Sequence, residues 1–377
     1  RLADAYDINL KELSGDDDSQ AAASLKEVFS DPIFEGLKLS NHELTDLVGA
    51  SPSAAQSVVT LYRAYRESLT NNSAMAEQLA NQEGTAQTGA LRFPIEEVRD
   101  YFHDTNNHFP ELENAAEILW ADAELTLDDL YFGLRDHLKA AHDISVRIMP
   151  IDVLPDTTWR LDRHSRRLFL SEILNAPSRT FQLALHAGLL GHRNLLDEMV
   201  ARTDLQGDEA KQLCRLGLAN YFAGAVTMPY ERFQTAANKL RYDIELLGQR
   251  FSASYEQVSH RLTTLQRPGA KGVPFFFLRV DHAGNISKRF SASGFHFARF
   301  GGTCPRWHIH EAFRTPDKII PQVVEMEDGT SYFTISRTVR GMGVGYKMPE
   351  QQLAIGIGCK LDYARQIVYT DGLDLAD

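Results

Sequence analysis

Residues 181–192 read FQLALHAGLLGH, and this stretch decides the fold of the middle of the chain. Its pattern predicts a helix in which Leu185 and Leu189, four residues apart, lie on one face. Two His side chains at such positions grip one metal ion, as in the H-E-x-x-H pattern, whereas leucines cannot ligate a metal at all. The stretch therefore predicts a buried helix with an apolar face where a metal site would need nitrogen ligands.

A second stretch, LANYFAGAVTMPY at 218–230, follows about thirty residues later. Together the two stretches resemble the ImmA/IrrE-type zinc metallopeptidases. The resemblance places leucines at all three zinc-ligand positions of that family: Leu185, Leu189 and Leu218. His186 takes the place of the general-base Glu. The resemblance therefore implies a middle domain with the peptidase fold that has lost its metal ligands, and it points from catalysis toward sensing.

A zinc site built from His186 and His192 fails on geometry. Six residues turn a helix by roughly 600°, so these two side chains face well apart. Nor does the chain contain a convincing Ser-His-Asp or Cys-His arrangement for a nucleophilic enzyme. We therefore expect a protein that is not an enzyme, with a zinc metallopeptidase as the least favoured alternative.

Composition restricts the remaining classes. The 377 residues are enough for two or three domains, with 43% hydrophobic and 24% charged residues as in ordinary globular proteins. A signal peptide and a membrane-spanning apolar run are both missing, and the three Cys are scattered, which predicts a cytoplasmic protein without a membrane partner. The net charge of −12 argues against nonspecific nucleic-acid binding by the chain as a whole.

The expected fold class is α+β, with a mainly helical N-terminal part and a small α+β C-terminal domain. Linker-like composition at 81–89 and 266–270 separates the parts. The predicted domains are a helix-turn-helix remnant, a helical linker or dimerisation region, a degenerate peptidase-like ligand-binding domain and the C-terminal domain, at 1–14, 15–82, 90–265 and 266–377. A long helix from Pro52 to Leu69 carries Val58 and Tyr62 on one face, which suggests a homodimer.

Individual elements are expected as follows. A strand is predicted at 144–150, a hairpin at 159–170, a helix at 213–226 and a helical segment at 230–264. The C-terminal pattern predicts strands at 274–280, 286–290, 323–326, 332–337 and 352–358, then a short helix at 361–368. Asp328-Gly329 marks a hairpin between two of these strands.

A wider resemblance covers essentially the whole chain. It rests on the stretches YDINLKELSGDD, LANYFAGAVTMPY, HRLTTLQRPGAKGVPFFFLRVD, GNISKRFSASGFHFARFGGTCPRWHIHEAF and AIGIGCKLDYARQIVYTDGLDL. These resemble the bacterial short-chain fatty acyl transcriptional regulators of acetate and propionate metabolism. The resemblance implies a helix-turn-helix domain that binds promoter DNA, of which only the last helix is expected here, and a short-chain acyl-CoA or CoA effector. Some members are described as carrying an iron–sulfur cluster.

The leucines then predict an apolar cleft floor for a short acyl chain, because each buried methylene contributes about 0.8 kcal/mol. Phosphates of the effector call for cations in fork geometry, and Arg167 and Arg179 are the preferred candidates beside this cleft. The alternative is that the arginines of the predicted hairpin only form its solvated tip. Tyr221 and Tyr230 are candidates for stacking on adenine or lining the pocket, with core aromatics as the alternative.

The candidate metal ligands are three cysteines: Cys214, Cys304 and Cys359. Cys304 precedes a proline in a glycine-rich loop, as in cluster-binding loops. Inert buried cysteines are the first alternative, and a zinc site from Cys304, His308 and His310 is a weaker one. The favoured hypothesis is an acyl-CoA-sensing regulator, and its alternative is an iron–sulfur redox sensor that binds no acyl-CoA.

Overall fold

The protein is described by a computed structural model over residues 94–154, 157–292, 295, 308–326, 329–341 and 352–373, with isolated positions between 24 and 62. Two units make up the chain, Arg1–Gln87 and Thr88–Asp377. The expected helix-turn-helix remnant at 1–14 and the loop that carries Cys304 lie outside the described residues.

The first unit has a small apolar core of its own. Its buried side chains are Leu25, Val28, Val48, Ala55 and Val59. Val58 and Tyr62, which the sequence predicts to face a second protomer, are partly buried against this core. The described residues of this unit therefore use these two side chains for internal packing.

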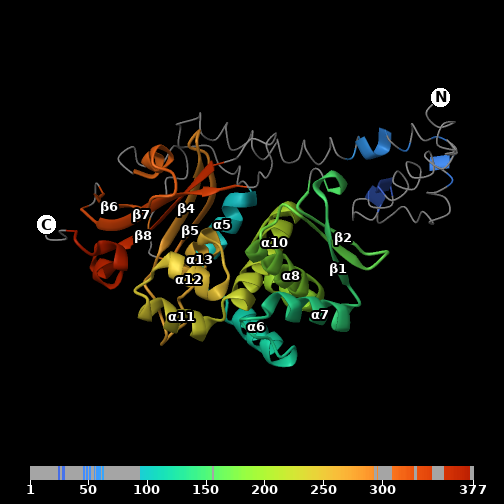
Figure 1. Ribbon diagram of the computed structural model, residues 1–377, viewed down its shortest axis with the longest axis horizontal. Coiled ribbons are helices and arrows are strands. Elements are labelled where there is room, and N and C mark those ends of the chain that lie inside the picture. Colours follow the sequence, from blue (N-terminus) through green and yellow to red (C-terminus); the bar gives the residue numbers. More distant parts are fainter. Residues whose placement is uncertain are drawn as a thin grey trace, which may run out of the picture. The chain divides into compact units, whose positions relative to one another are not determined.

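The peptidase-like part of the second unit consists of helices with a three-stranded sheet along one side (Figure 1). Its helices are α5 (Pro94–Asp104), α6 (Pro110–Asp122), α7 (Leu130–His142), α8 (Ala176–Gly191), α9 (Arg193–Ala201) and α10 (Gly207–Thr227). Its strands are β1 (Ser145–Met149), β2 (Trp159–Asp162) and β3 (Arg167–Ser171), with the 3-10 turn η2 (Ile151–Val153) between the first two. The sheet order is β1-β3-β2, with β1 parallel and β2 antiparallel to β3. The predicted strand and hairpin are confirmed.

Helix α10 is the centre of this part and packs against α5, α6, α8 and α9. The crossing with α8 is close at Gly188, where an added Cβ would lie 2.6 Å from the ring of Phe222. A side chain at this position would therefore force the two helices apart. The tight α8–α10 crossing is what brings the two stretches that resemble a peptidase into one core.

The expected helical segment at 230–264 is three helices: α11 (Tyr230–Lys239), α12 (Ile244–Phe251) and α13 (Tyr255–Leu262). Arg241 and Tyr242 end the first helical run with left-handed φ angles of 51° and 61°, and Ser252 ends the second at 49°. Hydrogen bonds by side chains restart the helices, from Leu246 N–H to Asp243 and in a capping box at Ser254. Left-handed residues do not continue a right-handed helix, so the segment turns back on itself.

The C-terminal part is an antiparallel sheet with the order β5-β4-β8-β7-β6. Its strands are β4 (Phe276–Asp281), β5 (Ile286–Ser291), β6 (Ile320–Glu325), β7 (Ser331–Arg340) and β8 (Gln352–Lys360). The five predicted strands are confirmed. The expected helix at 361–368 is instead two 3-10 turns, η4 (Leu361–Gln366) and η5 (Val368–Thr370), and a further one, η3 (His308–Arg314), lies against β7 and β8.

This sheet is buried on both faces. One face contributes Phe276, Leu278 and Val280 of β4 to a core with η3. The other face contributes side chains of β7 and β8, among them Phe333 and Ile357, to a core that also contains residues of α11, α12 and α13. Helices α11–α13 therefore cover one face of the C-terminal sheet (Figure 1), and the sequence boundary at 265/266 runs through a shared core.

Candidate ligand-binding site

The three leucines at the former zinc-ligand positions lie together in the core of the peptidase-like part. Leu185 on α8 is 3% exposed, and Leu218 on α10 is 0% exposed. Leu189 is partly buried and packs against the same core. The interpretation of Leu185 and Leu218 as buried packing residues is confirmed, and their role as a ligand floor stays a prediction.

His186, at the former general-base position, is buried beside Trp159, with 4.6 Å between the ring centroids. Its Nδ1 lies 2.8 Å from the carbonyl oxygen of Gln182, so Nδ1 carries the proton and donates. Burial lowers the pKa of His186, which keeps the imidazole neutral. Its Nε2 is then an acceptor, and it has no donor among the described residues. The side chains at the three former ligand positions near this imidazole, Leu185, Leu189 and Leu218, have no atom that could ligate a metal.

The two candidate phosphate ligands are not brought together. Arg167 is exposed at the start of β3. Arg179 donates from Nη2 to the carbonyl oxygen of Glu172, 2.8 Å away, just beyond the other end of that strand. At about 3.3 Å per residue these two ends lie roughly 16 Å apart. The structure therefore does not form a clamp from this pair.

Tyr221 and Tyr230 belong to buried hydrogen-bond networks. The hydroxyl of Tyr221 donates to Glu113 at 2.6 Å, and the hydroxyl of Tyr230 donates to the carbonyl of Ala270 at 2.9 Å. Tyr230 also accepts from the backbone N–H of Arg267 at 2.8 Å. Both rings are at most 2% exposed, so they are structural rather than open to a stacked ligand.

The network around Tyr221 contains a buried ion pair. Arg261 on α13 donates to both carboxylate oxygens of Glu113 on α6, at 2.6 and 2.9 Å, and from Nε to the carbonyl of Met228 at 3.0 Å. Burial by itself raises the pKa of Glu113, but the charge and hydrogen bonds of Arg261 outweigh it and lower the pKa. The pair ties the peptidase-like helices to the helices that cover the C-terminal sheet.

The two described cysteines do not fit a shared iron–sulfur cluster. Cys214 lies in the core around α10, and Cys359 lies in the separate core beneath α11–α13. Both thiols are buried, and burial raises the pKa of each to about 12. Within the described part of the chain, His, Cys, Asp and Glu side chains form no group of three that could hold a metal ion.

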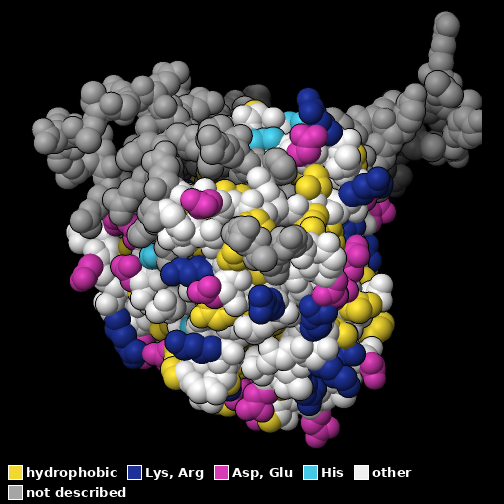
Figure 2. Space-filling model, turned by 90° about the vertical axis from the view of Figure 1, so that its left-hand side faces the viewer, with side chains coloured by type: hydrophobic (Ala, Val, Ile, Leu, Met, Phe, Trp, Pro, Cys, Tyr) yellow, Lys and Arg dark blue, Asp and Glu magenta, His cyan; other side chains and the backbone are white. Residues whose placement is uncertain are grey.

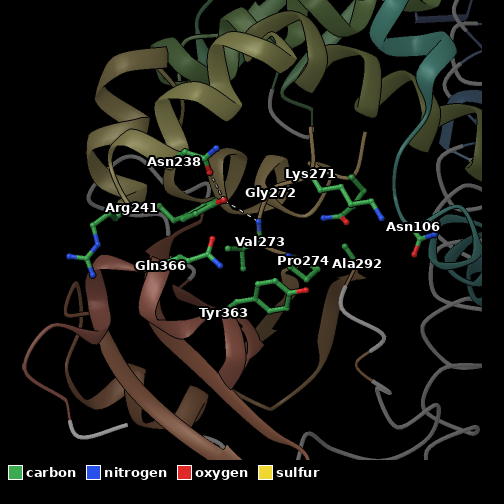
Figure 3. A pocket seen from close by; sticks show the side chains of 12 residues that line it. Asn106, Asn238, Arg241, Lys271, Gly272, Val273, Pro274, Ala292, Tyr363 and Gln366 are labelled. Carbon is green, nitrogen blue, oxygen red and sulfur yellow. Dashed lines mark hydrogen bonds between the residues drawn. The ribbon is translucent and has the colours of Figure 1, made fainter. Parts of the chain in front are cut away.

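A polar cleft of about 750 Å³ opens where the peptidase-like helices meet the C-terminal part (Figure 3). Its volume is in the range of small-molecule and cofactor sites, about 300–1,000 Å³. The lining comes from the end of α11, the connection before β4, the α5–α6 turn, the end of β5 and η4: Asn106, Asn238, Arg241, Tyr242, Gln266, Lys271, Gly272, Val273, Pro274, Ala292, Tyr363 and Gln366. We refer to this feature as the junction cleft.

Tyr242 holds the back of the junction cleft together. Its hydroxyl donates to Oδ1 of Asn238 at 2.7 Å and accepts from the backbone N–H of Val273 at 3.1 Å, as the dashed lines in Figure 3 mark. The N–H of Gly272 also donates to the carbonyl of Leu265 at 2.8 Å. These bonds fix the connection between α13 and β4 against the end of α11, so both walls of the cleft are held in place.

The unpaired charge in the described lining of the junction cleft is positive. Its described lining contains the cations Arg241 and Lys271 and no carboxylate. Arg241 is engaged with both oxygens of Asp371 at 2.8 Å, whereas Lys271 is exposed and makes no hydrogen bond or ion pair with the described residues. Nε2 of Gln266, a donor, is buried without a partner among them. In a chain of net charge −12, such a lining favours an anionic or acceptor-rich ligand.

Sequence reasoning missed the junction cleft. The sequence of Gln266 and the residues after it predicts only a domain boundary, and that of Tyr363 and Gln366 only part of a short helix. The cleft forms from segments more than a hundred residues apart, so no local spacing reveals it. The one available signal is the boundary itself, because ligand sites occur preferentially at domain interfaces.

Both parts of the second unit match known families. Residues 140–263 match the IrrE N-terminal-like domain, and residues 264–377 match the short-chain fatty acyl coenzyme A regulator, C-terminal. The junction cleft takes lining residues from both matched regions. No helix in the described residues is long and apolar enough to cross a bilayer.

Several bacterial proteins are similar in sequence to this chain. The chain is 40% identical over its full length to the HTH-type transcriptional regulator PrpR of Mycobacterium tuberculosis, of which it covers 76%, and 39% identical over its full length to RamB of the same organism, of which it covers 78%. It is 37% identical, over 99% of its length, to the propionyl-CoA carboxylase regulator of Cereibacter sphaeroides, 78% of which is covered. A solved Mycobacterium tuberculosis transcriptional regulator superposes with a TM-score of 0.72 and 44% identity, over 76% of this chain and 86% of that one.

The fold and these relatives define a transcription regulator built on a peptidase-like domain, and not an enzyme. The chain belongs to the family of short-chain fatty acyl coenzyme A regulators. The family resemblance that the sequence stretches predicted is thereby confirmed.

Proposed function

We propose that this chain is the effector-sensing part of a bacterial transcriptional regulator of short-chain fatty acid metabolism, and that a short-chain acyl-CoA binds in the junction cleft. The observation that carries the proposal is the position of the cleft at the seam between the two family regions. A ligand there touches both regions at once. Its volume of about 750 Å³ suits a ligand of cofactor size.

The chemistry of the lining supports the same ligand class. Lys271 supplies a mobile ammonium group for a phosphate, and Gln266 supplies an amide donor for a carbonyl oxygen. Coenzyme A carries phosphates at one end and two amides along its pantetheine arm. The leucines of the peptidase-like core, by contrast, are occupied by packing, so we place the effector in the junction cleft rather than beside α8.

Regulation follows from differential affinity. An effector shifts an arrangement of the regulator only as far as it binds one arrangement more tightly than another. We propose that the regulator acts as a homodimer and that promoter DNA is bound by a helix-turn-helix domain, of which the sequence predicts the last helix at 1–14. On the face of the second unit that Figure 2 shows, basic and acidic side chains are interspersed. This mixture supports the placement of DNA binding in the helix-turn-helix domain rather than on this face.

The test is calorimetry with acetyl-CoA, propionyl-CoA and free CoA on the wild-type chain and on Lys271→Gln. Loss of one phosphate contact is expected to weaken binding about tenfold, or about 1.4 kcal/mol. Lys211→Gln is the matched control, because Lys211 is an exposed lysine at the start of α10, away from the cleft lining. Absence of binding to all three ligands, or equal affinities for Lys271→Gln and wild type, would contradict the proposal.

A further inference from the structure

A second, smaller cleft of about 300 Å³ adjoins the junction cleft. Two pairs of consecutive residues separate them on opposite walls. Asn106 lines the junction cleft and Asn107 the smaller one, while Ala292 lines the junction cleft and Ser291 the smaller one. Because neighbours in the chain line different clefts on both walls, the two clefts are neighbouring compartments with these two pairs of residues between them.

The Asn106–Asn107 turn between α5 and α6 is built to separate these compartments. Both residues have left-handed φ angles, 51° and 53°, a conformation that Asn tolerates better than most residues. Their backbone N–H groups donate to the carbonyls of His103 and Phe102 at 2.9 and 2.8 Å, which fixes the turn. The two successive side chains therefore serve two different compartments.

The carboxamide of Asn107 offers an acceptor that nothing described satisfies. Asn107 is 1% exposed, and its Nδ2 donates to Oγ1 of Thr263 at 2.6 Å. The hydroxyl proton of Thr263 is directed to the carbonyl of His260 at 2.7 Å, so this hydroxyl can only accept from Asn107. Oδ1 of Asn107 is thus left without a donor among the described residues. A buried acceptor of this kind is unfavourable unless a donor reaches it.

The rest of the smaller cleft combines aromatic rings with charged side chains, among them the carboxylates of Asp100 and Asp104. Phe102 and Phe290 line it, with 6.4 Å between their ring centroids. Arg99 and Arg289 also line it, and both pair with Glu96. Aromatic surface with amide and carboxylate acceptors suits a planar base that has N–H donors, and the carboxylates disfavour a phosphate.

We infer that the smaller cleft receives the purine base of the effector, with its exocyclic amine donating to Asn107 Oδ1 and its ring against Phe290. This inference rests on the proposed function and gives the ligand a direction. The phosphates then lie where Lys271, Asn106 and Ala292 share one side of the junction cleft in Figure 3, and the acyl end lies toward Asn238 and Arg241 on the other side.

The first experiment changes the ligand and leaves the protein intact. Calorimetry compares propionyl-CoA, its 1,N6-etheno analogue, which has lost the exocyclic amine donor, and propionyl-4′-phosphopantetheine, which has no base. Binding is expected to weaken about tenfold for the etheno analogue and at least tenfold for the pantetheine ester. Equal affinity of propionyl-CoA and its etheno analogue would overturn the inference while leaving the proposed function intact. Failure of all three to bind would overturn both.

The second experiment changes the protein. Phe290→Ala is expected to weaken propionyl-CoA about tenfold and to leave the affinity for propionyl-4′-phosphopantetheine unchanged, because only the former places a base on this ring. Equal weakening of both esters would indicate a general structural effect and overturn the inference. Phe132→Ala, which changes an exposed phenylalanine of α7, is the control and should affect neither ester.

Discussion

The peptidase-like core and the junction cleft differ in how tightly they are packed and in how polar their side chains are. Around α8 and α10 the positions that would hold a metal are filled by leucines, and Leu218 is fully buried. Between α11 and η4 the lining is polar, cationic and open. The difference teaches that the former metal-ligand positions now contribute to packing, whereas an open polar cleft lies at the seam with the C-terminal part.

The largest expected effect concerns the buried ion pair between Arg261 and Glu113, which joins α13 to the peptidase-like helices. Arg261→Met leaves Glu113 as an unpaired buried charge, so the free energy of unfolding should fall by about 3–5 kcal/mol. Urea denaturation measures the change. The double variant Glu113→Leu with Arg261→Met removes both charges and should recover much of the loss. Arg193→Met, at an exposed and loosely paired arginine, is the control. If Arg261→Met behaves like this control, the pair does not tie the two sides together.

The next test contrasts one residue from each region. Leu218→Ala removes a fully buried side chain from the peptidase-like core and should lower the free energy of unfolding by about 2–5 kcal/mol. Gln366→Ala, in the exposed lining of the junction cleft, should change it by less than about 0.5 kcal/mol. Thermal and urea unfolding of both variants give the comparison. A small loss for Leu218→Ala would mean that the core around α8 and α10 is loosely packed.

The smallest effect concerns pH. Burial, followed by the charge of Lys288, lowers the pKa of His260 to about 3, although Glu256 acts in the opposite direction and Arg261 in the same one. Between pH 6.5 and 3 the unfolded chain therefore binds a proton at His260 that the folded chain does not. Stability from this residue is present above pH 6.5 and is lost as the pH falls, by about 2 kcal/mol from pH 7 to pH 5.

Urea denaturation at pH 7 and pH 5 measures this loss. His260→Leu should flatten the dependence of stability on pH, whereas His310→Leu, at an exposed histidine, should leave it unchanged. If the free energy of unfolding of His260→Leu depends on pH as that of the wild type does, other titratable groups dominate the loss of stability at low pH.

Much of the fold could be predicted from the sequence because its signals are local. The i,i+4 leucines, the hairpin at 159–170 and the C-terminal strands have periodicities that the structure confirms. The division of the segment 230–264 into three helices could not be predicted, because the left-handed turns occur at Arg241 and Ser252, residue types that rarely adopt a positive φ. The site was harder still. Tyr221 and Tyr230 were candidates for a pocket, but whether an aromatic ring faces a ligand or a buried carboxylate depends on partners such as Glu113, more than a hundred residues away.

The core that α11–α13 share with β7 and β8 also has a practical consequence. The two family regions meet at 263/264, which invites a cut at that point for recombinant work. A C-terminal fragment made in this way would carry Phe333, Ile335 and Ile357 on a bare sheet face, and its N-terminal counterpart would carry helices without the sheet they cover. Exposed apolar surface of this kind promotes aggregation. The boundary between the two family regions is therefore not a boundary between two parts with separate cores. A fragment chosen for expression should contain both sides of it.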